Sequence, residues 1–543
     1  MGRNLAKRAA LLLSAGMLAA CPWPAPEPPE NAPGLILLVV VDQLGADHLV
    51  RLNDAFEGGI RRLLDEGVVF GEAHHAHAGT STAPGHASIV TGCHPSSHGV
   101  ISNYWFDRAT GLEVYSAEDE RNRRSPARLE CSSFGDWLKA TYRPSRVYSM
   151  SAKDRSAILM GGHRADGAYW YDWDGTFTSS DYYHEDNPRW LEQANAEGFL
   201  ASTYGRLWEP LAFDPEVLAG MGVDQYDLGP LEEDFPHPIG GLSPVPGEFF
   251  FGELFDSPWL DEYLLRLARG VIEAESLGRD SYPDLLALGF STTDSVGHGH
   301  GPWSREFFDI LVRLDRELGS FFDWLDQSIG MDRVAVVLTS DHGSVPIPEK
   351  RAEGGLPGSR VGFEEIRCFQ AVDAALDTEF GAGDWFRPGL FFSPLPEGSQ
   401  VSLDEVKERA RALLEVCPSV SKVWLAEELS SEGDDPMQRR FARSYFAARS
   451  PDLLVEWEPY FLATASSASS HGTPHRYDTH VPLVLMWPGG EPGRNSYPVS
   501  TVDIAPTLAE WTGVTPPTEI DGRSLSGAMV APSAEAPSDA SVP

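Results

Sequence analysis

Four apolar runs, each about as long as one strand, are spread over the 543 residues of the chain. The first covers residues 35–41 and is ended by Asp42, and the others cover 284–290, 333–338 and 481–486. Such a run is typical of a strand buried on both faces, as in a parallel sheet. Between two of them, Glu306 to Leu325 has apolar residues on one helical face. This alternation predicts an α/β fold with a doubly wound, mostly parallel central sheet and helices on both faces.

One large domain with an insertion accounts for the length. We expect it to cover residues 34–530, with an inserted cap subdomain at about 360–466. Within the insertion, Ser402 to Glu415 reads as a helix, and a strand-like pair surrounds Leu453 and Tyr460. Residues 531–543 are rich in Ala, Ser and Pro, which predicts a disordered tail.

The first twenty residues have the pattern of an export signal. Basic residues precede an apolar stretch, 9–20, that is too short to span a bilayer as a stable helix. It ends in Leu-Ala-Ala-Cys21, which resembles a bacterial lipobox, and the alternative is an ordinary secretory signal cut near Ala20. Residues 21–33 are Pro-rich and predict a stiff tether. We therefore expect an exported protein, lipid-anchored at Cys21 in the cell envelope, in the periplasm or at the outer membrane.

Composition excludes several classes of protein. With 42% hydrophobic residues and a net charge of −38, the chain is neither a mainly disordered protein nor a multi-span membrane protein. The acidity argues against nucleic acid as a partner, because phosphate backbones require Lys and Arg on the protein. It still allows a small anionic substrate, since local cations can override the global field. We expect a monomer.

The four cysteines beyond Cys21 leave the redox state open. An exported chain meets an oxidising compartment, where Cys93–Cys131 and Cys368–Cys417 disulfides could form. Four cysteines allow three pairings. Four free, buried thiols are an equally weighted alternative.

Asp and His residues recur after the predicted strands. The carboxyl ends of parallel strands are where open α/β sheets bind ligands. Carboxylate and neutral imidazole are what Zn²⁺ binds when no thiolate is offered. Six such ligands suit two metal ions, one held by two His and one Asp and the other by one His and two Asp plus a nucleophile. The six are Asp42, Asp294, His298, Asp341, His342 and His471. Six further histidines compete for these assignments: His74, His75, His77, His300, His475 and His480.

The segment Thr82-Ala-Pro-Gly-His86-Ala-Ser adds a hydroxyl group to these ligands. Together with Val41-Asp42-Gln43, Asn103-Tyr-Trp, residues 151–155, Ser340-Asp-His-Gly and His471-Gly-Thr-Pro, it resembles the alkaline phosphatase superfamily. Within that superfamily the chain is most similar to PafA-like alkaline phosphatases, which are related to type I phosphodiesterases and nucleotide pyrophosphatases. The likeness runs from about residue 34 to 525, and Thr501-Val-Asp-Ile-Ala-Pro matches the usual start of the closing helix.

This resemblance assigns roles to individual residues. It implies two Zn²⁺ ions, with Asp294, His298 and His471 on one, and with Asp42, Asp341 and His342 on the other, which also binds the Thr82 oxygen. Thr82 aligns with the nucleophile and Asn103 with a residue that hydrogen-bonds a phosphoryl oxygen. Lys153 and Arg155 align with a pair that reaches the remaining oxygens. The implied reaction is hydrolysis of phosphate monoesters through a covalent phosphothreonine, which releases inorganic phosphate.

Lys153 and Arg155 favour a monoester substrate over a diester. A monoester carries close to two negative charges and a diester carries one. Two cations at positions i and i+2 lie on one side of an extended segment, where they suit a dianionic phosphoryl group. By itself, a basic segment of this kind is more often a solvated turn.

Other functions remain as alternatives. A phosphodiesterase or nucleotide pyrophosphatase on the same fold would share Thr82, Asn103 and all six ligands, but usually lacks the Lys-x-Arg pair. A sulfatase needs a Cys or Ser motif that Cys93-His-Pro-Ser-Ser matches only in part. A mutase of the superfamily would be expected in the cytosol. A catalytically inactive, surface-displayed binding protein would suit the tether and the acidity.

Overall fold

The computed structural model describes residues 26–223, 235–240, 245–383, 385–395, 400–517 and 519–528. The predicted signal peptide, the anchor at Cys21 and the tail at 531–543 lie outside these residues. Within the described part of the chain, no helix has both the length and the apolar character needed to cross a membrane.

A nine-stranded sheet forms the centre of the molecule and confirms the predicted fold class. Five neighbouring strands, from β9 to β14 in the spatial order, run parallel. The run at 481–486 contributes β21, which is antiparallel to both of its neighbours. In spatial order the strands are β10 (Phe177–Thr178), β9 (Gly167–Tyr171), β8 (Val147–Ser151), β13 (Asp284–Phe290), β1 (Leu35–Val41), β14 (Val334–Thr339), β21 (Leu483–Met486), β2 (Val68–Phe70) and β22 (Gly493–Asn495).

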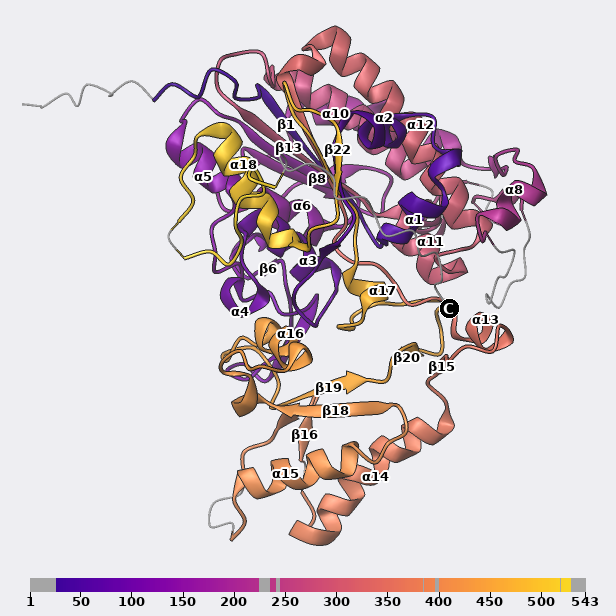
Figure 1. The fold of residues 1–543 in the computed structure, drawn as a ribbon, viewed down its shortest axis with the longest axis vertical. Helices are drawn as coiled ribbons and strands as arrows, with labels where there is room; N and C mark the ends of the chain where they lie inside the picture. Colours follow the sequence, from indigo (N-terminus) through magenta and orange to yellow (C-terminus); the bar gives the residue numbers. More distant parts are fainter. Residues whose placement is uncertain are drawn as a thin grey trace, which may run out of the picture.

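Helices cover both faces of this sheet (Figure 1). Because successive side chains of a strand point to opposite faces, Leu37 and Val39 of β1 join one core, whereas Leu38 and Val40 join the other. The first core is closed by α2 (Gly59–Glu66), α10 (Trp259–Glu275) and α12 (Arg305–Ser328), the helix expected at 306–325. The second is closed by α3 (Thr82–Thr91), α5 (Phe134–Thr141), α6 (Asp154–Gly161) and α18 (Ile504–Thr512).

Short elements connect this framework. The helices among them are α1 (Ala46–Arg51), α4 (Pro95–His98), α7 (Arg189–Ala196), α8 (Pro215–Gly220), α9 (Glu248–Glu253), α11 (Thr292–His300), α13 (Pro348–Glu353) and α17 (Arg476–Thr479). The strands are β3 (Ala73–His74), β4 (Tyr104–Asp107), β5 (Leu112–Tyr115), β6 (Glu118–Asp119), β7 (Arg123–Arg124), β11 (Leu207–Trp208), β12 (His237–Pro238) and β23 (Val499–Ser500). Of these, the β4–β5 hairpin matters most for function, because it directly follows Asn103.

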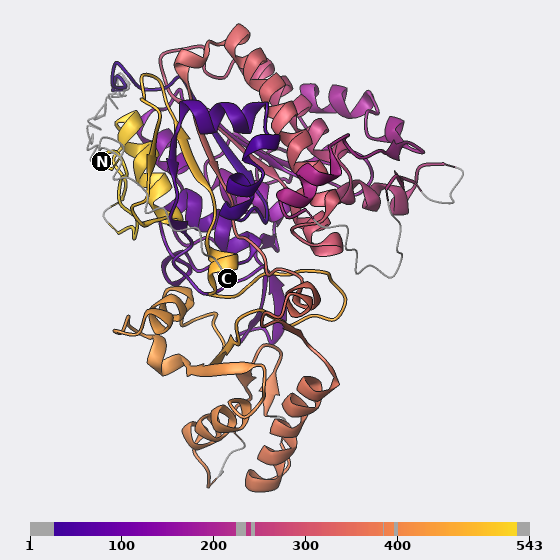
Figure 2. The ribbon, with the colours of Figure 1, turned by 45° about the vertical axis from the view of Figure 1, so that its right-hand side comes forward.

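The segment predicted as an insertion forms a lobe below the sheet, drawn in orange (Figures 1 and 2). It has an apolar core of its own and a Cys368–Cys417 disulfide between α14 and the end of α15. Its elements are β15 (Ser359–Arg360), α14 (Phe363–Phe380), β16 (Phe386–Arg387), β17 (Phe391–Phe392), α15 (Leu403–Leu414), β18 (Val420–Leu425), α16 (Pro436–Ser444), β19 (Leu453–Trp457) and β20 (Phe461–Leu462).

Two local expectations are met only in part. The strands near Leu453 and Tyr460 do not pair with each other, because β19 pairs with β18 and β20 pairs with β15. The two equally weighted alternatives for the cysteines are each met in part, because Cys368–Cys417 is a disulfide while Cys93 and Cys131 are free thiols. The neighbouring Cys131 thiol and burial raise the pKa of the Cys93 thiol.

Candidate functional site

Three aspartates meet at the carboxyl ends of three adjacent strands. Asp42 directly follows β1, Asp341 follows β14, and Asp294 lies in the first turn of α11 behind β13. The spatial order β13-β1-β14 places the three strand ends side by side. All three side chains are buried, and carboxylates buried together require compensating positive charge. The common edge expected from the sequence is therefore present.

Three histidines complete this cluster, and each is held by a backbone carbonyl. The Nδ1 atom of His298 donates to Ser469 O at 2.8 Å, that of His471 to Thr80 O at 2.8 Å, and that of His342 to Gly343 O at 3.0 Å. A carbonyl can only accept, so Nδ1 carries the proton in all three rings. In a neutral imidazole the Nε2 atom is then left with a lone pair.

Those three Nε2 atoms face carboxylate oxygens. His298 Nε2 lies 3.3 Å and His471 Nε2 lies 3.5 Å from Asp294 Oδ1. His342 Nε2 lies 3.4 Å from both Asp42 Oδ1 and Asp341 Oδ2. The nitrogen and oxygen atoms form two groups compact enough to hold a metal ion: Asp294, His298 and His471, and Asp42, Asp294 and His342.

The donor set fits divalent metal ions. Asp42 Oδ1, Asp341 Oδ2 and His342 Nε2 are buried and have no hydrogen-bond partner among the described residues. Carboxylate and imidazole lone pairs that converge in a buried site suit a bound cation. A histidine whose second nitrogen donates to a carbonyl has the orientation usual for a metal ligand. The structure thus brings together all six residues predicted as ligands.

Thr82 is the first residue of α3, and its side chain is buried. Arg155 Nη2 lies 3.4 Å from Thr82 Oγ1. Next to it, Asn103 Oδ1 accepts a hydrogen bond from the Ala83 N–H at 2.9 Å, which leaves the Asn103 amide NH₂ available as a donor. A hydroxyl, an amide and a guanidinium group therefore surround one point beside the carboxylates.

Lys153 and Arg155 reach the site by a route that differs from the prediction. They do not lie on an extended segment, because α6 begins at Asp154, with Lys153 as its N-cap and Arg155 in its first turn. Lys153 Nζ lies 2.5 Å from both Asp42 Oδ2 and Asp294 Oδ2. The turn at the helix start directs both side chains to the edge of the sheet.

Charge is concentrated in this cluster. Burial and the carboxylates of Asp294 and Asp341 raise the pKa of Asp42 well above its usual range. Burial also opposes ionisation of Asp294, but the neighbouring groups, with the charge of Lys153 foremost, outweigh it and hold the pKa of Asp294 well below its usual range. Burial lowers the pKa of His471 far below its usual range and lowers the pKa of His342 as well. Both rings are therefore neutral, as ligation requires.

Three supporting residues were missed in the sequence. Gln43, with a left-handed φ of 67°, donates from Nε2 to Asp294 Oδ1 at 2.9 Å. His86 Nδ1 lies 2.8 Å from Thr82 O and 3.3 Å from Asp341 Oδ2. Tyr115 hydrogen-bonds Asp154 at the start of α6. The first two lie inside motifs that were recognised, whereas Tyr115 has no local signal because it arrives from a separate hairpin.

None of the six competing histidines joins the cluster. His75 bonds Ser340 O, His475 bonds Trp457 O and His480 bonds Gly71 O. His74 and His480 do form a separate group with Glu72, but Arg476 already donates to both carboxylate oxygens of Glu72.

A cleft of about 900 Å³ opens over the cluster. Lys153, Arg155, Asp294 and His298 line it. A partly buried cleft with convergent cations and carboxylates is the usual form of an active site for a small charged substrate.

Fold and cluster together define a class of enzyme, the phosphoester hydrolases. The chain belongs to the family described as type I phosphodiesterase / nucleotide pyrophosphatase, whose model matches residues 36–480. It is similar to alkaline phosphatase PafA of Elizabethkingia meningoseptica, with 29% identity over 91% of this chain and 94% of that protein. Alkaline phosphatase PhoK of a Sphingomonas species is 31% identical over 91% of both chains.

A solved structure agrees with these relatives. The crystal structure of wild-type PafA superposes with a TM-score of 0.82 at 28% identity, covering 91% of this chain and 98% of that one. The predicted likeness to PafA-like alkaline phosphatases is thereby confirmed for sequence and fold.

Proposed function

We propose that the protein hydrolyses phosphate monoesters through a covalent phosphothreonine at Thr82, with two zinc ions bound by the six ligands. The observation that carries this proposal is a pair of cations at the site, one beside Thr82 and one between the aspartates. Arg155 lies within hydrogen-bonding distance of the hydroxyl, and Lys153 lies between the two ligand groups. Two cations at one phosphoryl position match the two negative charges of a monoester better than the single charge of a diester.

Asp294, His298 and His471 would hold one ion, and Asp42, Asp341 and His342 the other. Bound zinc would lower the pKa of a coordinated hydroxyl and neutralise charge on the attacking and leaving oxygens. The anchored Nδ1 atoms keep each ring in the tautomer that ligation needs.

The chain's own groups position and neutralise the phosphoryl group. Asn103, Lys153 and Arg155 hold its oxygens while Thr82 Oγ attacks phosphorus, the phosphorus–oxygen bond to the alcohol breaks, and the alcohol departs with a proton. Water then attacks phosphorus in the same in-line sense. The bond to Thr82 Oγ breaks, and inorganic phosphate leaves. Positioning and charge neutralisation are the main demands of phosphoryl transfer.

Replacement of the hydroxyl tests the nucleophile. Thr82→Ala should leave zinc binding largely intact but lose kcat by roughly 1,000-fold or more, since its covalent route is removed. The matched control, Thr82→Ser, keeps a hydroxyl and should retain turnover and a labelled phospho-enzyme after acid quench. An unchanged kcat in Thr82→Ala would refute the assignment.

Charge removal tests the substrate class. Lys153→Ala and Arg155→Ala should each reduce kcat/KM for p-nitrophenyl phosphate more than for bis-p-nitrophenyl phosphate. Arg121→Ala removes one exposed cation outside the cleft and should leave the ratio of the two rates unchanged. An equal loss on both substrates would favour the phosphodiesterase alternative.

Export and lipid anchoring at Cys21 belong to the same proposal. Both rest on the leader sequence alone, and the mass of the mature amino-terminal peptide from membrane fractions tests them. An unmodified peptide starting near residue 21 would favour an ordinary secretory signal.

A further inference from the structure

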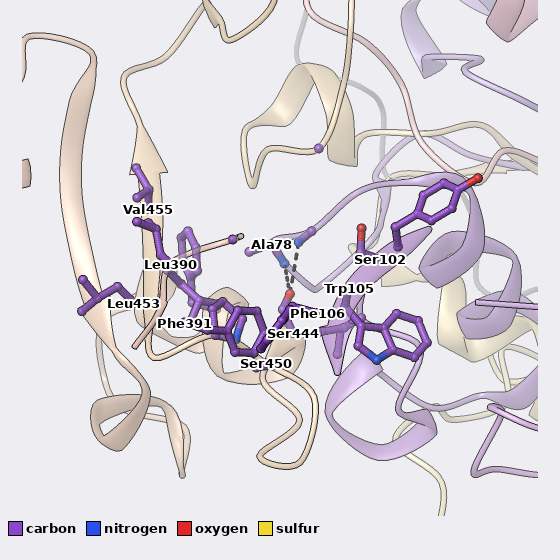
Figure 3. A pocket seen from close by; sticks show the side chains of 18 of the residues that line it. Ala78, Ser102, Trp105, Phe106, Leu390, Phe391, Ser444, Ser450, Leu453 and Val455 are labelled. Carbon is purple, nitrogen blue, oxygen red and sulfur yellow. Dashed lines mark hydrogen bonds between the residues drawn. The ribbon is translucent and has the colours of Figure 1, made fainter. Parts of the chain in front are cut away.

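A second cavity, of about 400 Å³, lies between the β4–β5 hairpin and the inserted lobe (Figure 3). Its walls are mostly apolar. The hairpin contributes Trp105 and Phe106, and the lobe contributes Leu390, Phe391 and Leu453. Glu113 is the only charged side chain among the described residues that line it. This volume lies within the range of pockets that bind small organic molecules.

The cavity is built into the edge of the candidate site. Ser102 and Tyr104, which flank Asn103, line it, and so does Gly472, which follows His471. Neighbouring Cα atoms are about 3.8 Å apart, so these walls begin one residue away from two site residues. Tyr104, whose side chain is 53% exposed, lines both this cavity and the charged cleft. The two hollows therefore adjoin at that ring.

Hydrogen bonds and an ion pair among the wall residues hold the walls in place. Ser444 Oγ accepts hydrogen bonds from the N–H groups of Ala78 and Gly79 at 2.8 and 3.1 Å, as Figure 3 shows. Arg108, in the turn between β4 and β5, forms an ion pair with Asp452 at 3.0 Å and donates to Ser450 O at 3.0 Å. A pre-formed apolar cavity binds an apolar group at little ordering cost.

We propose that this cavity receives the apolar part of the substrate's alcohol, so that the enzyme prefers phosphate monoesters of alkyl or aromatic alcohols. The inference rests on the proposed monoesterase function. The phosphoryl group belongs in the charged cleft because Lys153 and Arg155 line that cleft. A hydrocarbon chain attached to it gains free energy only where water is displaced from apolar walls. The cavity beyond Tyr104 supplies such walls next to His471, one of the candidate metal ligands.

Two substrates of similar intrinsic reactivity test the proposal, hexyl phosphate and glycerol 3-phosphate, because both are esters of primary alcohols. For the zinc-loaded protein we expect kcat/KM to be at least about ten-fold higher for hexyl phosphate. Val455→Trp, which adds bulk at the cavity wall, should reduce this ratio at least about five-fold. Val416→Trp adds the same ring at a side chain of the lobe that is 77% exposed, away from the cavity, and should leave the ratio as in the wild type.

A second variant keeps the test decisive if Val455→Trp fails to fold. Leu390 has a φ of 64°, which Asn tolerates, so Leu390→Asn should preserve the backbone while making the wall polar. It should lower the hexyl-to-glycerol ratio and weaken equilibrium binding of 2-naphthol, followed by fluorescence. Equal rates on both substrates, or a ratio and 2-naphthol affinity that neither variant alters, would overturn the inference and leave the monoesterase standing. No hydrolysis of either substrate by zinc-loaded wild type would instead overturn the proposed function.

Discussion

The candidate ligands are oriented by hydrogen bonds from neighbouring residues. Gln43 is one of these, since its side chain donates to Asp294 and its backbone N–H lies 3.3 Å from Asp341 Oδ1. It connects aspartates from both proposed metal positions. Its left-handed backbone is a strain of the kind that persists where the surrounding structure imposes it.

Removal of the Gln43 amide should weaken metal binding. Gln43→Ala is expected to lower zinc affinity about 10- to 100-fold, measured by competition with a chelator, because Asp294 loses the donor that orients it. At saturating zinc, kcat should fall less than affinity does. Gln193→Ala, on an exposed part of α7, is the matched control. Wild-type affinity in Gln43→Ala would show that Asp294 is oriented without it.

A buried acid near the site gives the protein a stability that depends on pH. Asp478 Oδ2 accepts hydrogen bonds from the N–H and the hydroxyl of Thr473 at 2.8 and 2.7 Å. Thr473 lies two residues after His471. Burial raises the pKa of Asp478 to about 8. In the unfolded chain the pKa of an aspartate is about 3.9. The folded state therefore binds an extra proton between these two values.

The sign of the effect follows from that proton. Below about pH 4 Asp478 is protonated in both states and does not reduce the free energy of unfolding. As the pH rises from about 4 to about 8, Asp478 ionises in the unfolded chain but stays protonated in the folded one, so the free energy of unfolding falls. Asp478→Asn cannot ionise, so its free energy of unfolding relative to wild type should increase with pH, by on the order of 5 kcal/mol at pH 9. Urea unfolding at pH 5, 7 and 9 measures this. Exposed Asp186→Asn should show no trend, and a flat difference for Asp478→Asn would disprove the buried proton.

At the scale of elements, the site depends on how closely α3 packs on the end of β14. A Cβ atom at Gly85 would lie 2.3 Å from the Asp341 carbonyl oxygen and 2.8 Å from its Cβ. No side chain fits there. Glycine at this position lets the helix that carries Thr82 touch the strand end that carries Asp341 and His342.

A methyl group at Gly85 should therefore push these elements apart. Gly85→Ala is expected to lower kcat/KM about 100-fold, because reacting groups tolerate little displacement, and to lower the free energy of unfolding by about 1–3 kcal/mol. The control is Gly220→Ala at the end of α8, where a Cβ meets nothing within 4 Å. Activity of Gly85→Ala near that of wild type would mean that α3 can shift without moving Thr82.

Elements with a local, repeated pattern in the sequence could be predicted. The runs at 35–41 and 284–290 match β1 and β13 to the residue, because a strand buried on both faces is apolar over nearly its whole length, with Asp284 at the start of β13 as the exception. Features that depend on contacts with distant segments could not be predicted. The start of α6 at Asp154 was missed because an extended reading of residues 153–155 fits the sequence equally well. The antiparallel direction of β21 depends on the partners it meets, β14 and β2.

The site shows the same division. The six candidate ligands and Thr82 could be named because each lies in a motif near a strand end. Tyr115 could not, since its contact with Asp154 joins residues 39 positions apart. The cavity between hairpin and lobe is likewise invisible in the sequence, because it exists only once the inserted lobe packs beside Asn103.

For the whole molecule, the dominant electrostatic fact is the net charge of −38. A phosphate monoester approaching this surface is repelled at long range, although Lys153 and Arg155 attract it inside the cleft. Salt screens the long-range part, because the Debye length is about 10 Å at 0.1 M, and affects buried pairs much less. A change in ionic strength therefore distinguishes the long-range repulsion from the attraction inside the cleft.

We expect kcat/KM for a dianionic monoester to rise about two-fold between roughly 20 and 200 mM NaCl, because screening removes the repulsion that slows encounter. The turnover number at saturating substrate should stay constant, since the bound complex does not depend on encounter. Phosphocholine, whose ammonium group offsets part of the phosphate charge, is the matched substrate and should respond less. A steep fall of kcat/KM with salt would instead show that the field of Lys153 and Arg155 extends beyond the cleft and dominates the approach.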